Sequence, residues 1–422
     1  MVGRARRTRL AARRTRLAAI FLVAAAALAG CTSNGASWQS PGGNTPTTPS
    51  KPPLHLVYSH ESGEANVSPG KPVTVQATDG SLDTVSLASA AGEVSGLLAA
   101  DGSMWRTVDD LAFGQAYTLT VKGHGSDGKA VEETRTFTTV SPADGFYWNV
   151  SFKTSGAYYG VALNGGTFGV GQPIVAQFDD AVDRAVAQKT ITVQTNPPVE
   201  GAWHWMSDRE AHWRPQNYWA AGTTVTITAN LFGVALTSPV GGRELHGQKN
   251  QTAQFTIGPA KVGRIDNNTK QMVVSIDGQA VRTIPVSLGR EQAYQGINGT
   301  WYDWRTPSGT MVVTEKQNPV QMKPDLPKND PQYYEEIIPL ATRITDSGIY
   351  VHAAPWSVND QGVRNVSHGC VNVSTANAQW FFDTFGPGDV VEVANAGTTV
   401  GLRDGLGDWN MPWDQWVAGS AA

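Results

Sequence analysis

The residues best suited to chemistry are one cysteine and two histidines in the last third of the chain. Cys370 lies in the hexapeptide Ser-His-Gly-Cys-Val-Asn at positions 367–372, and His352 precedes it by eighteen positions. The 422-residue sequence contains 2 cysteines, and the other one, Cys31, lies near the N-terminus. An unpaired thiol with histidines nearby in the sequence is typical of a nucleophilic cysteine site.

The expected site has three parts: a nucleophile, a base and donors for an oxyanion. Only a thiolate attacks, so Cys370 needs a nearby base, and we expect His352, at the end of a strand, to serve. His368 adjoins the cysteine but lies on a sharp Ser-His-Gly turn. Gly369 has no Cβ, so we expect the amides of Gly369 and Cys370 to face a developing oxyanion. This combination predicts acyl transfer.

Two other interpretations of these residues stay open at this point. His352, His368 and Cys370 have the side chains of zinc ligands, in which case a metal-activated water would be the nucleophile. Alternatively, Cys370 is a small buried apolar residue without a chemical role. The glycine turn and the lack of a nearby second cysteine favour the nucleophile over the metal site.

The composition indicates a strand-rich chain of several domains. The sequence has 45 glycines and 24 prolines, which favour strands and turns over helices. The net charge is -4, and beyond the N-terminus no basic stripe is present. This charge pattern argues against a nucleic-acid partner.

The N-terminus has the pattern of an export signal. Residues 1–16 contain seven arginines, and residues 17–30 form an apolar stretch. This stretch is shorter than the roughly twenty residues of a spanning helix, so residues 1–30 are predicted to be a signal peptide. Leu-Ala-Gly-Cys at 28–31 resembles a bacterial lipobox, in which Cys31 receives a lipid; the alternative is an ordinary cleavage site with an incidental cysteine.

Lipidation of Cys31 would leave Cys370 as a free thiol in an oxidising compartment. We therefore expect a lipoprotein on the outer face of the cytoplasmic membrane, facing the cell wall. Residues 31–53 are rich in Ser, Thr and Pro and are predicted to be a tether.

Two strand-rich blocks follow, residues 54–143 (the Ig-1 block) and 144–258 (the Ig-2 block). Trp105 and Gly114 in the first recur as Trp213 and Gly222 in the second, at one offset of 108 residues. Short strands separated by turns in units of about 100 residues predict Ig-like β-sandwiches in tandem. Tryptophans 203, 205, 213 and 219 are expected to pack in a core; a sugar-stacking surface is the alternative.

Residues 259–395 form the predicted catalytic block, also mostly β. Asp277-Gly278 predicts a hairpin turn, and a helix is expected near 374–385, just after the nucleophile. The segment 314–340 is rich in Pro, Gln and Asn and is expected to be a long irregular connection that serves as a lid; a plain insertion is the alternative. Residues 396–422, the C-terminal extension, carry three tryptophans that we expect to pin it against the catalytic or the Ig-2 block.

The hexapeptide and His352 together resemble the signature of the L,D-transpeptidase (YkuD-type) catalytic domain, a histidine followed after a short gap by Ser/Thr-His-Gly-Cys-x-Asn. The similarity to the mycobacterial lipoprotein members extends to residues 345–357, 377–380 and 405–416. Those members also carry two Ig-like domains before the catalytic one. The resemblance implies a peptidoglycan L,D-transpeptidase that forms 3→3 crosslinks through a cysteine thioester.

The resemblance also implies a role for each motif residue. It makes Cys370 the nucleophile and His352 the general acid and base, oriented by the backbone carbonyl of Ala353. Gly369 forms the oxyanion turn, and Ser367 and His368 complete the catalytic motif. Substrate contacts are implied at Tyr334, Ser347, Gly348 and Asn372.

The implied partners are peptidoglycan stem peptides, a tetrapeptide donor and a diaminopimelate acceptor, together with carbapenem inhibitors. No cofactor is implied. Some relatives bind calcium in the second Ig-like domain, but residues 246–252 lack acidic side chains, so no metal is predicted.

Two alternative functions remain. One is an L,D-carboxypeptidase that passes the same acyl group to water. The other is a wall-binding Ig-like lipoprotein with an inactive enzyme domain, which the intact Cys370, His352 and Asn372 argue against.

Overall fold

The structure is a computed structural model that describes residues 50–143, 145–157 and 160–421. The expected signal peptide, the lipobox with Cys31 and most of the tether lie outside the described residues. In the described part the chain is mostly β, as expected, and its helices are short. No helix in these ranges is long and apolar enough to cross a membrane.

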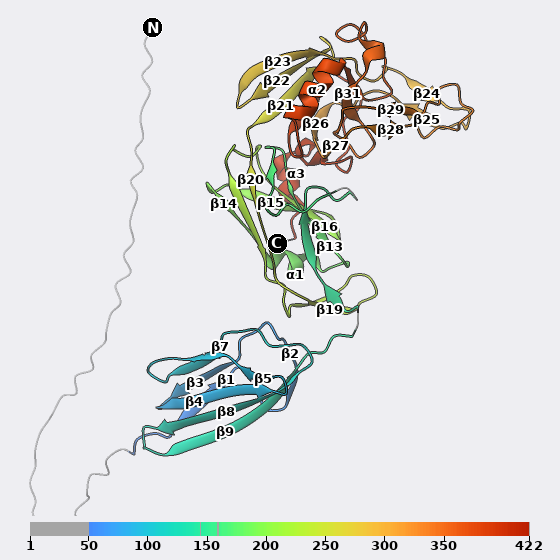
Figure 1. Ribbon diagram of the computed structural model, residues 1–422. Helices are drawn as coiled ribbons and strands as arrows, with labels where there is room; N and C mark the ends of the chain where they lie inside the picture. Colours follow the sequence, from blue (N-terminus) through green and yellow to red (C-terminus); the bar gives the residue numbers. More distant parts are fainter. Residues whose placement is uncertain (1–49, 144, 158–159, 422) are drawn as a thin grey trace, which may run out of the picture. The chain divides into compact units, whose positions relative to one another are not determined.

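The Ig-1 block, coloured blue to teal in Figure 1, forms two sheets within the described residues 50–143, in the orders β1-β3-β7-β6 and β2-β9-β8-β4-β5. Side chains from both sheets, Trp105 and Phe137 among them, share one buried cluster, as in a β-sandwich. The strands are β1 His55–Tyr58, β2 Glu64–Val67, β3 Thr74–Thr78, β4 Gly80–Ser89, β5 Gly92–Val94, β6 Gly96–Leu98, β7 Met104–Thr107, β8 Ala116–Gly125 and β9 Ala130–Thr139.

The described residues of the Ig-2 block form sheets in the orders β11-β13-β16-β15 and β12-β20-β17-β14, with a smaller sheet β10-β19-β18. One helix, α1, begins after Asp183, whose side chain accepts a hydrogen bond from Val186 N. The elements are β10 Tyr147–Trp148, β11 Val150–Lys153, β12 Thr167–Phe168, β13 Ile174–Phe178, α1 Arg184–Lys189, β14 Ile191–Asn196, β15 Gly201–Ser207, β16 Glu210–Pro215, β17 Thr224–Ala229, β18 Ala235–Thr237, β19 Glu244–Gly247 and β20 Gln251–Ile257.

The two Ig-like blocks are structural repeats. Trp105 on β7 and Trp213 on β16 occupy the third strand of corresponding sheets, which explains their fixed sequence offset. A Cβ added at Gly96 would overlap the Trp105 ring, and one at Gly201 would overlap the Trp213 ring. A glycine on each edge strand therefore makes room for the indole beside it.

The tryptophans of the Ig-2 block belong to its core. Trp203, Trp205, Trp213 and Trp219 are each between 3% and 8% exposed. Trp213 packs against Trp219 with 5.3 Å between ring centroids. The prediction of core packing is confirmed, because rings this deeply buried offer no face to a sugar.

The catalytic block packs the sheet β23-β22-β21-β33-β26 and the helix α2 against the sheet β27-β30-β31-β32. Its core combines side chains of both sheets with Ala378 and Phe381 of α2. The elements are β21 Lys261–Asp266, β22 Gln271–Ile276, β23 Gln279–Pro285, β24 Ala293–Gln295, β25 Trp301–Asp303, β26 Gly309–Val312, β27 Glu315–Gln317, β28 Val320–Met322, β29 Glu336–Ile338, β30 Ala341–Arg343, β31 Tyr350–Ala353, the 3₁₀ helix η1 Pro355–Ser357, β32 Val371–Val373, α2 Thr375–Thr384 and β33 Val390–Ala394.

Local sequence accounts for the hairpin and the helix of this block. Asp277 and Gly278 connect β22 to β23 with φ of 49° and 80°, the two positive values that a tight hairpin turn requires. The side chain of Ser374 accepts a hydrogen bond from Asn377 N and so caps α2. Both elements agree with the sequence prediction.

The segment 314–340 is irregular only in part, because residues 323–335 contain no helix or strand but the stretches before and after them include strands. It contains β27, which joins the sheet of β30 and β31, and an antiparallel pair formed by β28 and β29. A second antiparallel pair, β24 and β25, lies beside it, because Asp330 accepts hydrogen bonds from Tyr294 Oη at 2.7 Å and from Ile297 N at 2.9 Å. Strands this short are stabilised by such long-range contacts, which sequence periodicity does not reveal.

The C-terminal extension contains the 3₁₀ helix η2, Gly407–Asn410, and the helix α3, Trp413–Ala418, and it contacts the Ig-2 block (Figure 1). Trp416 is fully buried, stacks on His204 at 4.8 Å and donates its indole N–H to Ala202 O at 2.9 Å. The guanidinium of Arg214 lies 4.4 to 5.3 Å from the rings of Trp409, Trp413 and Trp416. The tryptophans thus hold the extension on the Ig-2 block, as expected, partly through cation–π contacts.

Candidate active site

Strand pairing brings the predicted nucleophile and base together. β31 and β32 are parallel, and His352 pairs with Asn372 in their register. Cys370 immediately precedes β32, so the sulfur and the imidazole lie at neighbouring strands of one sheet. Both line the same cavity of about 460 Å³, which Asn372 also lines.

The turn before β32 is fixed by the Ser367 hydroxyl. Ser367 Oγ accepts a hydrogen bond from Gly369 N at 3.1 Å and donates one to Cys370 O at 2.6 Å. Gly369 has a φ of +130°, a conformation that side-chain-bearing residues rarely adopt. The expectation that the Gly369 amide faces an oxyanion is not supported by this geometry, because that N–H is already engaged inside the turn.

The Cys370 amide is in a different situation. In the described residues it donates to no backbone or side-chain acceptor, whereas the carbonyl of Gly369 accepts from Thr306 Oγ1 at 2.7 Å. The turn therefore offers the Cys370 N–H, beside the sulfur, as a donor that no described acceptor engages.

His352 is held in one tautomer by its own backbone. Its Nδ1 lies 3.0 Å from the carbonyl oxygen of Ala353, which can only accept, so Nδ1 carries the proton and Nε2 is free to take another. The imidazole is 4% exposed, and burial lowers its pKa below the ordinary 6.5 although Ala353 O and the Asn372 side chain act in the opposite direction. His352 is therefore neutral at neutral pH.

Burial also keeps the thiol protonated. It raises the pKa of Cys370 to about 11, and the opposing effects of the Tyr350 N–H and the Arg343 charge are smaller. The thiol points at Gly348 O, 3.7 Å from Sγ. The resting site thus has a neutral thiol and a neutral imidazole that line one cavity, so the proton must leave the sulfur as the new bond forms.

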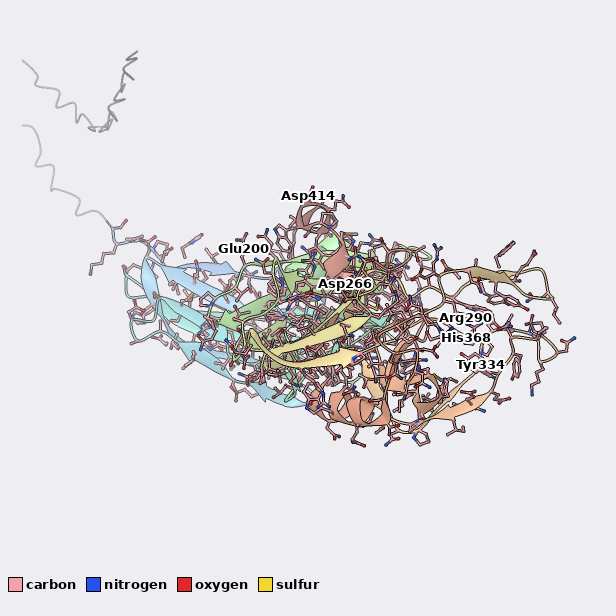
Figure 2. The ribbon with its side chains drawn as sticks, turned by 90° about the horizontal axis from the view of Figure 1, so that it is seen from above. Glu200, Asp266, Arg290, Tyr334, His368 and Asp414 are labelled. Carbon is pink, nitrogen blue, oxygen red and sulfur yellow. The ribbon has the colours of Figure 1, made fainter. Side chains whose placement is uncertain are left out.

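His368 is not placed to act as a base. Its ring lies 4.7 Å from that of Trp304 and 4.8 Å from that of Tyr334, and Figure 2 shows it between Arg290 and Tyr334. Burial and the Arg290 charge lower its pKa to about 4. His368 therefore forms part of the cavity wall as a neutral ring.

The lid segment and the turn are tied together by Arg290. Its guanidinium donates to Gln332 Oε1 at 3.0 Å and to Val366 O at 3.2 Å, and it lies 4.9 Å from the Trp304 ring. Tyr334, the substrate contact implied in the lid, lines the cavity, and burial raises its pKa to about 12. The opposite wall includes Trp356, which is 60% exposed and 6.1 Å from His352 between ring centroids.

Ser347 and Gly348 do not line this cavity. Gly348 lies on the other side of the sulfur, where its carbonyl faces Sγ. Ser347 is engaged by the C-terminal extension, because Asp404 accepts from its N at 2.6 Å and from its Oγ at 2.8 Å. The implied substrate contacts thus fall into two groups, Tyr334 with Asn372 in the cavity and Ser347 with Gly348 beyond the sulfur.

The geometry argues against the zinc interpretation. His368 faces aromatic rings, and His352 points Nδ1 at a carbonyl oxygen. Across residues 50–143, 145–157 and 160–421, no group of three or more His, Cys, Asp or Glu side chains is arranged to hold a metal ion.

Several residues near the site gave no signal in the sequence. Arg290, Trp304 and Thr306 precede the motif by 60 or more positions and reach it only through the fold. Asp404 reaches it from the C-terminal extension. Trp356 follows His352 by four residues, and this short separation was the one signal in the sequence that could have placed its ring near the base.

The sequence matches two protein-family models and several known relatives. The model of the YkuD L,D-transpeptidase catalytic domain matches residues 260–393, and that of a bacterial Ig domain matches residues 64–235. L,D-transpeptidase 2 of Mycobacterium tuberculosis is 39% identical over 373 residues, covering 87% of this chain and 85% of the relative. L,D-transpeptidase 5 of the same species is 32% identical over 378 residues, 88% of this chain and 78% of the relative.

Solved structures give a partial match. The L,D-transpeptidase LdtMt1 in complex with imipenem is 31% identical, with a TM-score of 0.46, and covers 58% of this chain and 100% of that one. L,D-transpeptidase 3 from Mycobacterium tuberculosis, solved with a faropenem-derived adduct, is 27% identical with a TM-score of 0.45, covering 60% of this chain and 99% of that one.

Proposed function

The chain belongs to the L,D-transpeptidase family of cysteine-dependent peptidoglycan cross-linking enzymes, and on that premise we propose that it forms 3→3 crosslinks through a Cys370 thioester. The donor is a tetrapeptide stem and the acceptor is the side-chain amine of diaminopimelate on a second stem. The observation that carries the proposal is the shared cavity of Cys370 and His352, with His352 Nε2 left free by the Ala353 contact.

In the acylation half, Cys370 Sγ attacks the carbonyl carbon of the third stem residue while its proton passes to His352 Nε2. The oxygen becomes an oxyanion that the Cys370 N–H stabilises. Collapse of this intermediate breaks the bond to the terminal D-Ala, whose amine takes the proton back from His352. The product is a thioester, and His352 is neutral again.

In the second half, the acceptor amine attacks the thioester carbon and loses a proton to His352. The C–S bond then breaks, the sulfur recovers the proton, and a new amide joins the two stems. Four residues are proposed substrate contacts: Tyr334, Ser347, Gly348 and Asn372. We propose that the two groups of contacts on either side of the sulfur give the two stems separate approaches to it.

Burial of the thiol and the imidazole favours transfer of the proton during the attack on the carbonyl rather than before it. A preformed thiolate is disfavoured, because the pKa of Cys370 is about 11 and that of His352 lies below 6.5. The proton therefore moves only when a carbonyl carbon is in place, which limits reaction of the thiol with other electrophiles.

Carbapenems are proposed to acylate the same sulfur. Attack on the strained lactam carbonyl forms the S–C bond and breaks the C–N bond, and the ring nitrogen takes the proton that His352 removed. Intact mass after incubation with meropenem should give one adduct on the wild type and none on Cys370→Ala. A chain without any adduct would remove this part of the proposal.

We further propose that Cys31 is lipidated and anchors the enzyme at the outer face of the cytoplasmic membrane. Metabolic labelling with a lipid analogue tests this, and Cys31→Ala is the matched control. Equal labelling of both chains would contradict it.

The decisive experiment incubates the chain without its signal peptide with a disaccharide-tetrapeptide and separates the products by mass. A crosslinked dimer with released D-Ala supports transpeptidation. A tripeptide without dimer supports an L,D-carboxypeptidase instead, and an unchanged substrate alongside an inactive Cys370→Ala control contradicts both. His352→Gln should abolish either product.

A further inference from the structure

Three peptide units make up the turn around the nucleophile, and each is held differently. Ser367 Oγ accepts from Gly369 N, which fixes the unit between His368 and Gly369. The same hydroxyl donates to Cys370 O, which fixes the unit between Cys370 and Val371. The unit in the middle, from Gly369 to Cys370, has no contact with Ser367.

The middle unit is the one that supplies the oxyanion donor. In a trans peptide the C=O and the N–H point in opposite directions. The carbonyl of Gly369 points into the protein, where Thr306 Oγ1 donates to it at 2.7 Å. The N–H of Cys370 must then point the other way, beside the sulfur.

Because residue 369 is a glycine, its backbone conformation alone does not fix the orientation of this peptide. A glycine tolerates both signs of φ, so the peptide that follows it can rotate with little steric cost. Gly369 already has a φ of +130°, and a Cβ placed there would meet nothing closer than 3.9 Å. The hydrogen bond to the Gly369 carbonyl is therefore the contact that selects the orientation of this peptide.

Thr306 is itself positioned to give only this contact. It is 1% exposed, and its Oγ1 accepts from Gly289 N at 2.9 Å, which directs the hydroxyl proton to Gly369 O. Pro307 follows it and restricts its backbone to extended conformations. Gly289 approaches so closely that a Cβ there would overlap Trp304 O.

We propose that Thr306 is a positioning residue that sets the oxyanion donor, by holding the Gly369 carbonyl inward and thereby turning the Cys370 N–H toward the reacting carbonyl oxygen. This inference rests on the proposed acyl transfer at Cys370. Thr306 touches neither the sulfur nor the substrate and acts only through the orientation of one peptide.

The test compares two reactions of the same sulfur. Acylation by meropenem develops an oxyanion. Alkylation by iodoacetamide forms an S–C bond and releases iodide while the thiol proton passes to His352, and it develops no oxyanion. Thr306→Val keeps the shape and removes the hydroxyl. We expect it to slow acylation about 10- to 100-fold and to change alkylation by less than about 3-fold, because only the first reaction uses the oxyanion donor.

Matched variants separate this role from a structural one. Thr342 is fully buried and its hydroxyl has no hydrogen-bond partner among the described residues, so Thr342→Val should acylate like the wild type. Thr306→Ser and Thr306→Ala differ by one oxygen atom, and the serine variant should restore fast acylation. This second pair keeps the test valid if Thr306→Val does not fold.

Two results would overturn the inference: acylation of Thr306→Val at the wild-type rate, or equal losses of acylation and alkylation. Equal rates for Thr306→Ser and Thr306→Ala would overturn it as well. Failure of the proposed function looks different, since the wild type would then form no adduct or Cys370→Ala would keep one.

Discussion

The buried pair of His212 on β16 and Asp408 in η2 is expected to make attachment of the C-terminal extension depend on pH. Asp408 Oδ1 lies 2.7 Å from His212 Nδ1, and Glu210 Oε1 lies 3.2 Å from Nε2. His212 is 4% exposed and Asp408 is 0% exposed. Burial alone would lower the pKa of His212, but the Asp408 and Glu210 carboxylates outweigh it and raise the pKa to about 9.

The contribution of this pair to the free energy of unfolding follows from the difference between the pKa of His212 in the folded and unfolded states. Raising the pKa from 6.5 to about 9 corresponds to about 3 kcal/mol of stability. Because the folded-state pKa is the higher one, this stability is fully present below pH 6.5 and is lost as the pH rises through about 9. At neutral pH most of it remains.

Asp408→Asn removes the main charge that stabilises the imidazolium. We expect the variant to be less stable than the wild type by roughly 2 to 3 kcal/mol at pH 6 and by well under 1 kcal/mol at pH 9.5. Thermal melting of both chains in the same buffers checks this, because the pH effects of other groups cancel in the difference. Glu244→Gln is the control, since it removes from His246 a carboxylate whose own side chain is 69% exposed to solvent, and it should cost at most about 0.5 kcal/mol.

A constant difference between wild type and Asp408→Asn from pH 6 to pH 9.5 would refute the reasoning. It would mean that His212 is neutral in the folded protein and that Asp408 stabilises the extension by a contact independent of charge. A difference that grows with pH would reverse the sign of the linkage and refute it equally.

Three further predictions concern the site and its support. Asp404→Ala removes both contacts to Ser347, so meropenem acylation should slow by about 3- to 10-fold through looser positioning of the adjoining loop, and an unchanged rate would contradict this. The acylation rate of the wild type should stay constant down to pH 6.5 and fall only below it, because burial lowers the pKa of His352; a fall centred above pH 6.5 would show that another group is the base. Gly201→Ala should lower the melting temperature, with a cost of about 1 to 3 kcal/mol, because its Cβ overlaps the Trp213 ring, and acylation at low temperature should be unaffected.

Much of the fold was accessible from the sequence because its signals are local. Asp277-Gly278 predicts its hairpin turn through the conformations that these residues favour, and the helix expected near 374–385 is present as α2. The repeated Trp105 and Trp213 indicate repeated sandwiches, because the same indole fills the same position in each. The short strands of segment 314–340 were not predicted, since β28 and β29 are three residues each and depend on contacts with distant parts of the chain.

The candidate site could be predicted from the sequence only in part. The hexapeptide around Cys370 and the preceding His352 stand out in the sequence, because a lone thiol shortly after two histidines has few structural explanations. The sequence does not reveal which backbone N–H would stabilise an oxyanion, because the hydrogen bond from Gly369 N to Ser367 Oγ depends on the geometry of the turn.

The sequence by itself predicted the chemistry: a cysteine nucleophile, a histidine base and a glycine turn carried on a strand-rich chain. The tertiary structure decided how these groups are held. Parallel pairing of β31 and β32 brings sulfur and imidazole to one cavity, and burial keeps both neutral. Thr306 and Asp404 reach the turn and its neighbouring loop from distant segments, because hydrogen bonds between chain segments depend on their positions in space and leave no pattern in the order of residues.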